Sequence, residues 1–240
     1  MTTIYDLFNP GNATDFFDKI PAPFHPNASA YDDANAWWLA ELSRLVYRQQ
    51  DRQRFLDSAG LEEIGPAMTH CFIVRAKDGT WAAVVFRGTA EAKDWIINID
   101  FPRVPWTTGE VHEGFKRALD EIWPQIKTVL DTLDCPIFCA GHSLGGAVAT
   151  LAASMRPPRA TYTYGSPLVG DTTFATSCAG TPMFRIVNDH DEVPTVPPAG
   201  LGFCHVGELH EIGKDAPHEF FERLADHAPI NYVRLLAASL

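Results

Sequence analysis

Cys135-Pro-Ile-Phe-Cys-Ala-Gly-His-Ser-Leu-Gly-Gly-Ala-Val-Ala-Thr-Leu-Ala-Ala-Ser154 is the stretch that decides the fold. A short apolar run meets a Gly-x-Ser-x-Gly sequence centred on Ser143, and an alanine-rich segment with a helical pattern follows. Strand, serine turn and helix in this order are typical of a nucleophile elbow, which holds a serine hydroxyl clear of the backbone. The glycines leave room for the tight turn, and the helix directs N–H groups toward an oxyanion. A purely structural strand-to-helix turn is the alternative interpretation.

Length and composition predict one large folded domain. The 240 residues fit a single α/β domain, residues 1–240, with residues 1–30 as an irregular N-terminal arm because this stretch is rich in proline. A hydrophobic fraction of 46% and a charged fraction of 20% predict a sizeable core. The net charge of −11 disfavours nucleic-acid binding and gives no attraction to anionic membrane surfaces.

The sequence gives no sign of a membrane span, a signal peptide or a metal site. No run approaches the roughly 20 apolar residues that cross a bilayer. The N-terminus lacks a basic start and a continuous apolar stretch, but a chain whose leader had been removed would look the same, so localisation stays open. The cysteines are five in number and lack metal-ligand spacing, so we expect no disulfide framework and no metal, with one bridge still open. Cys135 and Cys139 are expected to be core thiols.

Hydrophobic periodicity predicts the elements around the elbow. We expect an amphipathic helix over residues 32–50 and a single helix over 115–133, which would contain Pro124. The remaining expected elements are strands at 70–76 and 81–87 joined by an Asp-Gly turn, strands at 160–164 and 183–187, a second hairpin over 201–212, and closing helices at 220–224 and 230–240. This alternation predicts an α/β fold with a mixed, mostly parallel sheet and helices on both faces.

A serine hydroxyl needs a histidine to accept its proton and a carboxylate to orient that histidine. In α/β-hydrolases the order along the chain is serine, acid, histidine, so the partners of Ser143 must follow it. The candidate acids are Asp171, Asp189, Asp191 and Glu192, and the candidate bases are His190, His205, His210, His218 and His227. His112 and His142 precede or lie inside the elbow, and we expect them to be structural hydrogen-bonding residues.

Five segments together resemble the class 3 (fungal-type) lipase family of the α/β-hydrolase superfamily. They are Phe86-Arg-Gly-Thr89, Val111-His-Glu-Gly-Phe115, the Gly-His-Ser-Leu-Gly-Gly of residues 141–146, Tyr164-Gly-Ser-Pro167 and Val187-Asn-Asp-His-Asp-Glu-Val-Pro194. The resemblance implies a serine hydrolase that cleaves acylglycerol esters through an acyl-enzyme, without cofactor or metal. A feruloyl or short-chain esterase, a monoacylglycerol lipase and a phospholipase A1 remain alternatives on the same scaffold, and a non-catalytic lipase-like binding protein is a remote one.

The resemblance also selects among the candidate residues. The family's acid lies in a pattern like V-N-x-x-D-x-V-P, which favours Asp191 over Asp189. The family's histidine comes last, shortly before an aromatic residue and a helix, which favours His227 over His218 and His210. With Ser143 as nucleophile, the N–H groups of Leu144 and of the threonine after Phe-Arg-Gly, Thr89, are the implied oxyanion donors.

In relatives the region between the oxyanion threonine and the His-Glu-Gly-Phe segment holds a lid, here about residues 89–106. Trp95, Ile96 and Ile99 fall on one helical face and would cover the site or contact lipid, with core packing as the alternative. Asn98 replaces an aspartate that many relatives use to support the oxyanion donor, and Leu168 replaces an arginine. The expected partner is a lipid or small ester, at a lipid–water interface if the lid moves, and the oligomeric state stays open.

Overall fold

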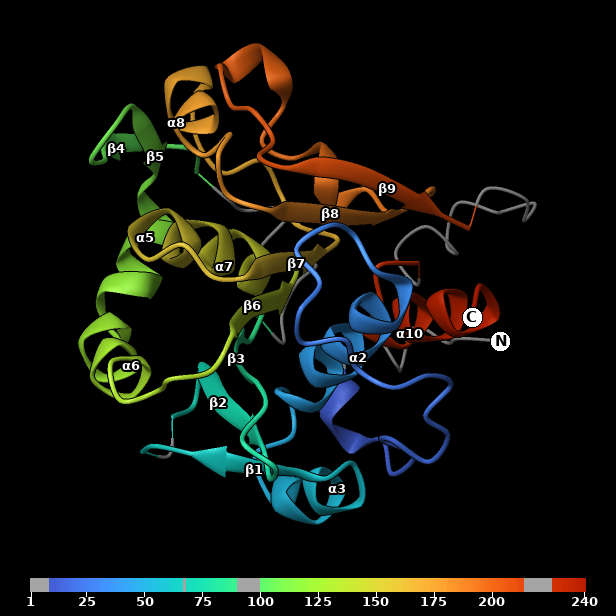
Figure 1. Ribbon diagram of the computed structural model, residues 1–240. Helices are drawn as coiled ribbons and strands as arrows, with labels where there is room; N and C mark the ends of the chain where they lie inside the picture. Colours follow the sequence, from blue (N-terminus) through green and yellow to red (C-terminus); the bar gives the residue numbers. More distant parts are fainter. Residues whose placement is uncertain (1–8, 67, 90–99, 214–225) are drawn as a thin grey trace.

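The structure is a computed structural model that describes residues 9–66, 68–89, 100–213 and 226–240. Within those ranges seven strands form one sheet with helices on both faces (Figure 1). Their spatial order is β1 (Leu61–Ile64), β2 (Cys71–Ala76), β3 (Ala82–Phe86), β6 (Ile137–His142), β7 (Ala160–Tyr164), β8 (Met183–Asn188) and β9 (Glu208–Ile212). The predicted α/β-hydrolase fold with a mixed, mostly parallel sheet is confirmed.

The sheet is antiparallel at one side and parallel through the rest. β1 pairs with β2 and β2 with β3 in antiparallel register, and the predicted Asp-Gly hairpin joins the latter two strands. Its turn has Gly79 at φ +75°, a conformation that glycine adopts without a steric cost. From β3 to β9 each neighbouring pair is parallel, so the carboxyl ends of these five strands meet at one edge of the sheet. In open α/β sheets this is the edge at which ligands bind.

One face of the sheet is covered by α5 (Glu113–Asp120), α6 (Trp123–Leu130) and α7 (Leu144–Met155), with α8 (Thr172–Ser177) beyond them (Figure 1). The prediction of a single helix over 115–133 was wrong. Pro124 occupies the first turn of α6, where its missing N–H has no intrahelical partner to lose, so a new helix begins there.

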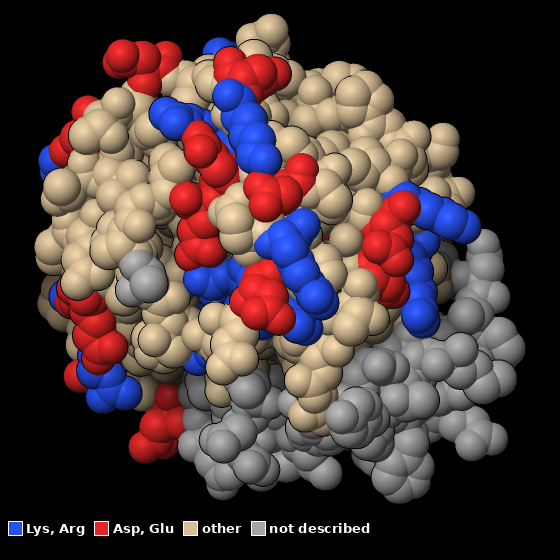
Figure 2. All heavy atoms as spheres, turned by 90° about the horizontal axis from the view of Figure 1, so that it is seen from below, with Lys and Arg blue, Asp and Glu red and all other residues tan. Residues whose placement is uncertain are grey.

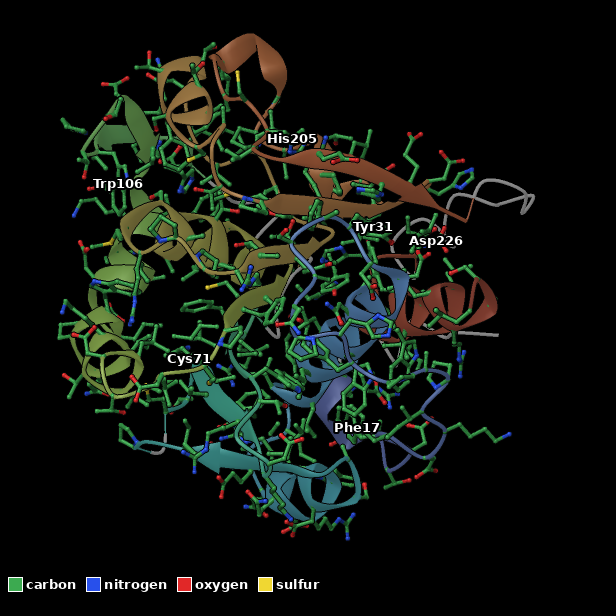
Figure 3. The ribbon with its side chains drawn as sticks, viewed as in Figure 1. Phe17, Tyr31, Cys71, Trp106, His205 and Asp226 are labelled. Atoms are coloured by element: carbon green, nitrogen blue, oxygen red, sulfur yellow. The ribbon has the colours of Figure 1, made fainter. Side chains whose placement is uncertain are left out.

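The other face is covered by α2 (Asp33–Leu45), α10 (Pro229–Ala238) and the N-terminal arm. The predicted helix over residues 32–50 is present as α2 and packs on the sheet, but the exposed polar face of an amphipathic helix is absent, because every residue of α2 after Asp33 is buried. The arm and α10 exclude water from the side of α2 that faces away from the sheet. Phe17 of the arm, labelled in Figure 3, is buried, and the Phe24 ring stacks on Trp81 at 3.8 Å between centroids.

A group of charges, which we call the arm cluster, ties the arm to α2; its Glu41 and Arg44 are buried and its Asp15 is exposed. Arg44 donates from Nε to Glu41 Oε2 at 2.9 Å and from Nη2 to Asp15 Oδ1 at 2.8 Å. The Phe17 N–H donates to Glu41 Oε1 at 3.0 Å, and the Arg44 guanidinium lies 4.3 Å from the ring centroid of Phe16. The arm is therefore held by ionic, hydrogen-bonding and cation–π contacts together.

Between residues 201 and 212 the predicted hairpin was wrong. β9 pairs with β8 in parallel register, while Cys204 forms an isolated bridge to Gly170. The predicted helix at 220–224 lies outside the described residues, and the last helix, α10, starts at Pro229. The periodicity also did not reveal strand β1 and helix α8. The other elements that it did not reveal are α3 (Arg52–Ser58), the paired strands β4 (Arg103–Pro105) and β5 (Glu110–His112), and the short helices η1 (Pro10–Asn12), η2 (Val193–Thr195) and η3 (Ala199–Leu201).

Acidic and basic side chains alternate on the surface shown in Figure 2. Around β1 and α3 the ion pairs are Arg52–Glu63, Arg75–Glu62 and Lys77–Asp57. All five cysteines are free thiols, and Cys139 is buried while Cys135 is half-buried. None of the described helices combines the length and the apolar character needed to span a membrane.

Candidate active site

The elbow lies where β6 ends and α7 begins. Ser143 has φ 59° and ψ −132°, a region that side-chain-bearing residues rarely adopt and that costs about 1–3 kcal/mol. Its N–H donates to the Tyr164 carbonyl at 2.9 Å, which ties the turn to the end of β7. The neighbouring sheet strand therefore helps to hold the strained serine in place.

Glycines around the elbow permit close backbone approach. A Cβ on Gly141 would collide with the backbone of Gly145, and a Cβ on Gly145 would collide with the Phe86 carbonyl. A Cβ on Gly88 would collide with the carbonyl of His142. The elbow and the end of β3 are thus in backbone contact, which is why the segment after β3 can reach the nucleophile.

Asp191 and His227 form a buried pair. His227 Nδ1 lies 2.7 Å from Asp191 Oδ2, and the two residues are 1% and 4% exposed respectively. An ionised carboxylate only accepts hydrogen bonds, so the imidazole carries its proton on Nδ1 and keeps a lone pair on Nε2. Asp191 Oδ1 accepts from the Val193 N–H at 2.9 Å, which fixes the second carboxylate oxygen.

The elbow serine lies close to this pair. His142, directly before Ser143, donates from Nε2 to the His227 carbonyl at 2.6 Å, and the two imidazole rings lie 4.4 Å apart. Ser143 Oγ and His227 Nε2 are both buried and have no hydrogen-bond partner within the described part of the chain. Unpaired buried polar atoms are uncommon and call for an explanation such as a catalytic role.

His142 has both ring nitrogens engaged. Its Nε2 carries the ring proton and donates it in a hydrogen bond to the His227 carbonyl. Nδ1 is therefore unprotonated and accepts a hydrogen bond from the Tyr47 hydroxyl at 3.0 Å. Burial lowers the pKa of His142 well below its usual range, and the nearby His227 adds to the shift. His142 is therefore a neutral structural histidine, and so is His112, whose Nδ1 accepts from the Gly114 N–H at 3.0 Å at the start of α5.

Two residues whose roles the sequence did not reveal, Tyr232 and Gly165, hold the acid and the base in place. The Tyr232 hydroxyl donates to Asp191 Oδ2 at 2.5 Å, and burial beside that carboxylate raises the pKa of Tyr232 so that it stays a donor. Gly165 has φ +56°, and a Cβ there would collide with Asp191 and approach His227. The Tyr-Gly-Ser-Pro segment was a signal for Gly165. Asn188 Nδ2 also fixes the chain before His227 by donating to the carbonyl of Asp226 at 3.0 Å; Asp226 is labelled in Figure 3.

The expected oxyanion donors, Leu144 and Thr89, belong to different elements that meet at one pocket. Leu144 is the first residue of α7, where helix N–H groups have no intrahelical acceptor, and Thr89 follows β3. Both line a pocket of about 360 Å³. The expected lid residues Trp95, Ile96 and Ile99, with Asn98, lie outside the described residues. The end of the expected lid region, Arg103–Pro105, is strand β4.

The competing acids lie elsewhere or serve other contacts. Asp171 caps α8 by accepting from the Phe174 N–H at 2.8 Å. Asp189 Oδ2 lies 3.6 Å from Nδ1 of the adjacent His190, and Glu192 is exposed. Asp191 is the candidate acid that the structure brings into contact with a candidate base from a distant segment.

The competing bases are likewise engaged at other places. His205 Nε2 donates to the Pro194 carbonyl at 2.8 Å, and burial lowers its pKa to about 4. His210 stacks on Tyr31 with 3.6 Å between ring centroids, on the side of the sheet near β9; Figure 3 labels Tyr31 and His205. His218 lies outside the described residues.

Comparison with known proteins gives the family. Residues 83–201 match the model of the class 3 lipases. A solved triacylglycerol lipase with a serine protease triad is 30% identical, with a TM-score of 0.57 over 66% of this chain and 69% of that one. The chain belongs to the class 3 lipase family.

Other class 3 relatives extend the comparison. The lipase of Rhizomucor miehei is 34% identical over 168 residues, which are 62% of this chain and 46% of that protein. Secreted mono- and diacylglycerol lipase 1 of Fusarium solani is 37% identical over 51% of this chain and 41% of its own length. The match thus spans less than half of these curated relatives. The structure of a Rhizomucor miehei lipase propeptide complex superposes with a TM-score of 0.66 at 26% identity, covering 85% of this chain and 77% of that one.

Proposed function

We propose that this chain is a serine carboxylester hydrolase of the lipase type, which cleaves acylglycerol esters through an acyl-enzyme intermediate. One observation carries the proposal. A buried imidazole is oriented by a carboxylate at 2.7 Å and keeps an unpaired Nε2, within the described residues, beside an elbow serine whose Oγ is also unpaired. The names of the relatives, lipase and mono- and diacylglycerol lipase, support the ester class.

Each step follows from a residue with a suitable chemical property. His227 Nε2 accepts the proton of Ser143 Oγ as that oxygen attacks the ester carbonyl, and Asp191 stabilises the resulting imidazolium. The N–H groups of Leu144 and Thr89 stabilise the oxyanion, where the loss of one donor typically costs ~10²–10³ in rate. His227 then protonates the leaving alkoxide, and in the second half it activates the water that releases the acyl group and frees Ser143.

Substrate must gain access to a serine that has no exposed surface. We propose that the region 89–106 acts as a lid and that Trp95, Ile96 and Ile99 contact lipid when it opens. The rate on tributyrin should then rise steeply above its solubility limit. A rate that follows soluble substrate smoothly through that limit would contradict the lid.

The proposal is tested with Ser143→Ala. Hydrolysis of 4-nitrophenyl butyrate by the purified variant should fall by at least ~10⁴-fold, because the nucleophile is lost. Ser177→Ala is the matched control, since its hydroxyl donates to the Phe174 carbonyl in α8 at 2.7 Å and its other partner is the adjacent Cys178. Turnover by the Ser143→Ala variant close to that of the control would rule out the mechanism.

A further inference from the structure

The pocket that adjoins the expected oxyanion donors has two kinds of lining. Its apolar side chains are Phe86, Ala118, Ile122, Leu144 and Val148. Its titratable side chains are His70, Arg87 and Glu121. A site that binds only hydrocarbon has no use for a guanidinium, because charged groups lose hydration when an apolar ligand covers them.

Arg87 directly follows β3 and, among the described residues, lacks the carboxylate partner that several other arginines have. Its Nε is buried without a hydrogen-bond acceptor, and no carboxylate of the described residues lies within ion-pair distance of it. Its polar side-chain neighbours include Tyr47 and His70, and His70 Nδ1 lies 3.5 Å from Arg87 Nη2. In contrast, Arg44, Arg52 and Arg75 each pair with a carboxylate at 2.9 Å or less.

An arginine that stays charged at any working pH and has an unsatisfied buried donor is suited to an anionic ligand. The guanidinium is planar and presents its donors in a fork that matches a carboxylate or a phosphate. The overall charge of −11 repels anionic molecules, so recognition of such a group must come from a local feature of this kind. Glu121 is exposed at the pocket, where solvent and salt weaken its repulsion.

We propose that Arg87 binds an anionic oxygen group, phosphate or carboxylate, that the ester substrate carries near its scissile carbonyl. The apolar side chains of the pocket contact the adjoining hydrocarbon. This inference rests on the proposed ester hydrolysis and names the substrate class that the same site prefers. A phospholipid head group and a dicarboxylic acid monoester are the two sources of such a group.

The experiment compares anionic with neutral esters in two pairs. Dihexanoyl phosphatidylglycerol and dihexanoylglycerol are each diluted into neutral detergent micelles, which keeps the surface potential equal. The monoester 4-nitrophenyl hydrogen glutarate and 4-nitrophenyl butyrate are compared in solution. In each pair the readout is the ratio of kcat/KM for the anionic ester to that for the neutral one. Arg87→Gln should lower the ratio about tenfold in at least one pair, because a charge-assisted hydrogen bond is lost.

Two further variants separate recognition from folding. Arg87→Lys keeps the charge without the fork and should retain part of the preference. Arg75→Gln removes an arginine that is 42% exposed and paired with Glu62, and both ratios should stay as in the unchanged protein. A fall confined to the first pair identifies phosphate as the group, and a fall confined to the second identifies carboxylate.

The inference and the proposed function fail in different ways. If Arg87→Gln leaves both ratios within about twofold, or if Arg75→Gln lowers them equally, the inference is overturned while hydrolysis of the neutral esters still supports the function. If the unchanged protein hydrolyses none of the four esters, the proposed function fails and the inference fails with it.

Discussion

Two polar clusters in this molecule both pair a carboxylate with a basic side chain, but they differ in whether all their buried polar atoms have hydrogen-bond partners. In the arm cluster of Asp15, Phe17, Glu41 and Arg44, no buried side-chain atom of Glu41 or Arg44 lacks a partner among the described residues. The carboxylate in the cluster of Asp191, His227 and Tyr232 has all its oxygens hydrogen-bonded, but His227 Nε2 and the nearby Ser143 Oγ have no partner among the described residues. A closed network fixes structure, whereas an open one keeps an atom available for a reacting molecule.

Their positions fit this difference. The arm cluster lies between α2 and the N-terminal arm, on the outer side of a helix that is buried all round. The second cluster lies at the carboxyl ends of β7 and β8, the edge that α/β sheets use for ligands. Substitutions in the arm cluster should therefore change stability, and substitutions in the second cluster should change activity.

Asp191→Asn should give the largest effect on the activity side. An amide in place of the carboxylate allows the wrong imidazole tautomer, and the serine protease precedent for this change is a loss of about 10⁴ in kcat. The measurement is steady-state hydrolysis of 4-nitrophenyl butyrate. Asp189→Asn, at the alternative acid two residues earlier, should stay within about threefold of the unchanged protein, and the reverse ranking would move the acid to position 189.

Glu41→Ala should destabilise the fold by about 3–5 kcal/mol, because it leaves the buried Arg44 without its main partner. Burial raises the pKa of Glu41 even though Arg44 opposes the shift, which shows how strongly the site is desolvated. Urea unfolding gives the free energy, and activity per folded molecule should stay within about twofold. The control is Glu62→Ala in the surface pair with Arg75, where we expect ~0.2–1 kcal/mol. Equal decreases in the free energy of unfolding for the two variants would contradict the interpretation that the arm cluster stabilises the fold as a buried, fully hydrogen-bonded network.

The sequence could predict what neighbouring residues determine. The elbow needs only strand, glycines, serine and helix in succession, and the Asp-Gly hairpin needs only its own turn and flanking strands. Asp191 and His227 were named from a family pattern and from chain order. The structure brings them together, and their catalytic roles stay predictions that the substitutions test.

The sequence could not predict what distant segments determine. The 208–212 segment has the composition of a hairpin strand, but its partner is β8 and the register is parallel. The interpretation of α2 as amphipathic assumed water on its outer side, where the arm and α10 lie instead. Tyr232 and Gly165 act on Asp191 across the fold. The absence of a carboxylate partner for Arg87 among the described residues likewise becomes visible only in the structure.

Tyr232→Phe tests whether the activity also depends on the hydrogen bond from Tyr232 to the Asp191 carboxylate. The variant removes one of the donors to Asp191 Oδ2 and leaves His227 as the side-chain donor to that oxygen among the described residues. A hydrogen bond to a charged group is worth about 1.5–3 kcal/mol, so kcat should fall on the order of 30-fold if the bond holds Asp191 in its productive orientation. Phe retains the packing of the ring. A loss of stability with kcat unchanged would make Tyr232 a structural residue alone.

The smallest expected effect concerns His142. It lies beside the cluster of Asp191, His227 and Tyr232, but both of its ring nitrogens are hydrogen-bonded, like the buried polar atoms of the arm cluster. The folded state keeps it neutral, since burial lowers its pKa well below 6.5. In the unfolded chain this histidine takes up a proton at its ordinary pKa. Below pH 6.5 the unfolded chain therefore binds more protons than the folded chain, and the free energy of unfolding decreases as the pH is lowered. One proton corresponds to about 1.4 kcal/mol per pH unit.

His142→Gln should remove that contribution. Urea unfolding between pH 7 and pH 5 should show a slope of the unfolding free energy that is shallower by up to about 1.4 kcal/mol per pH unit than in the unchanged protein. The comparison of slopes is insensitive to the constant cost of losing the bonds to Tyr47 and to the His227 carbonyl. If both proteins lose stability in parallel as the pH falls, His142 is not held neutral. Its interpretation as a fully hydrogen-bonded structural residue is then wrong.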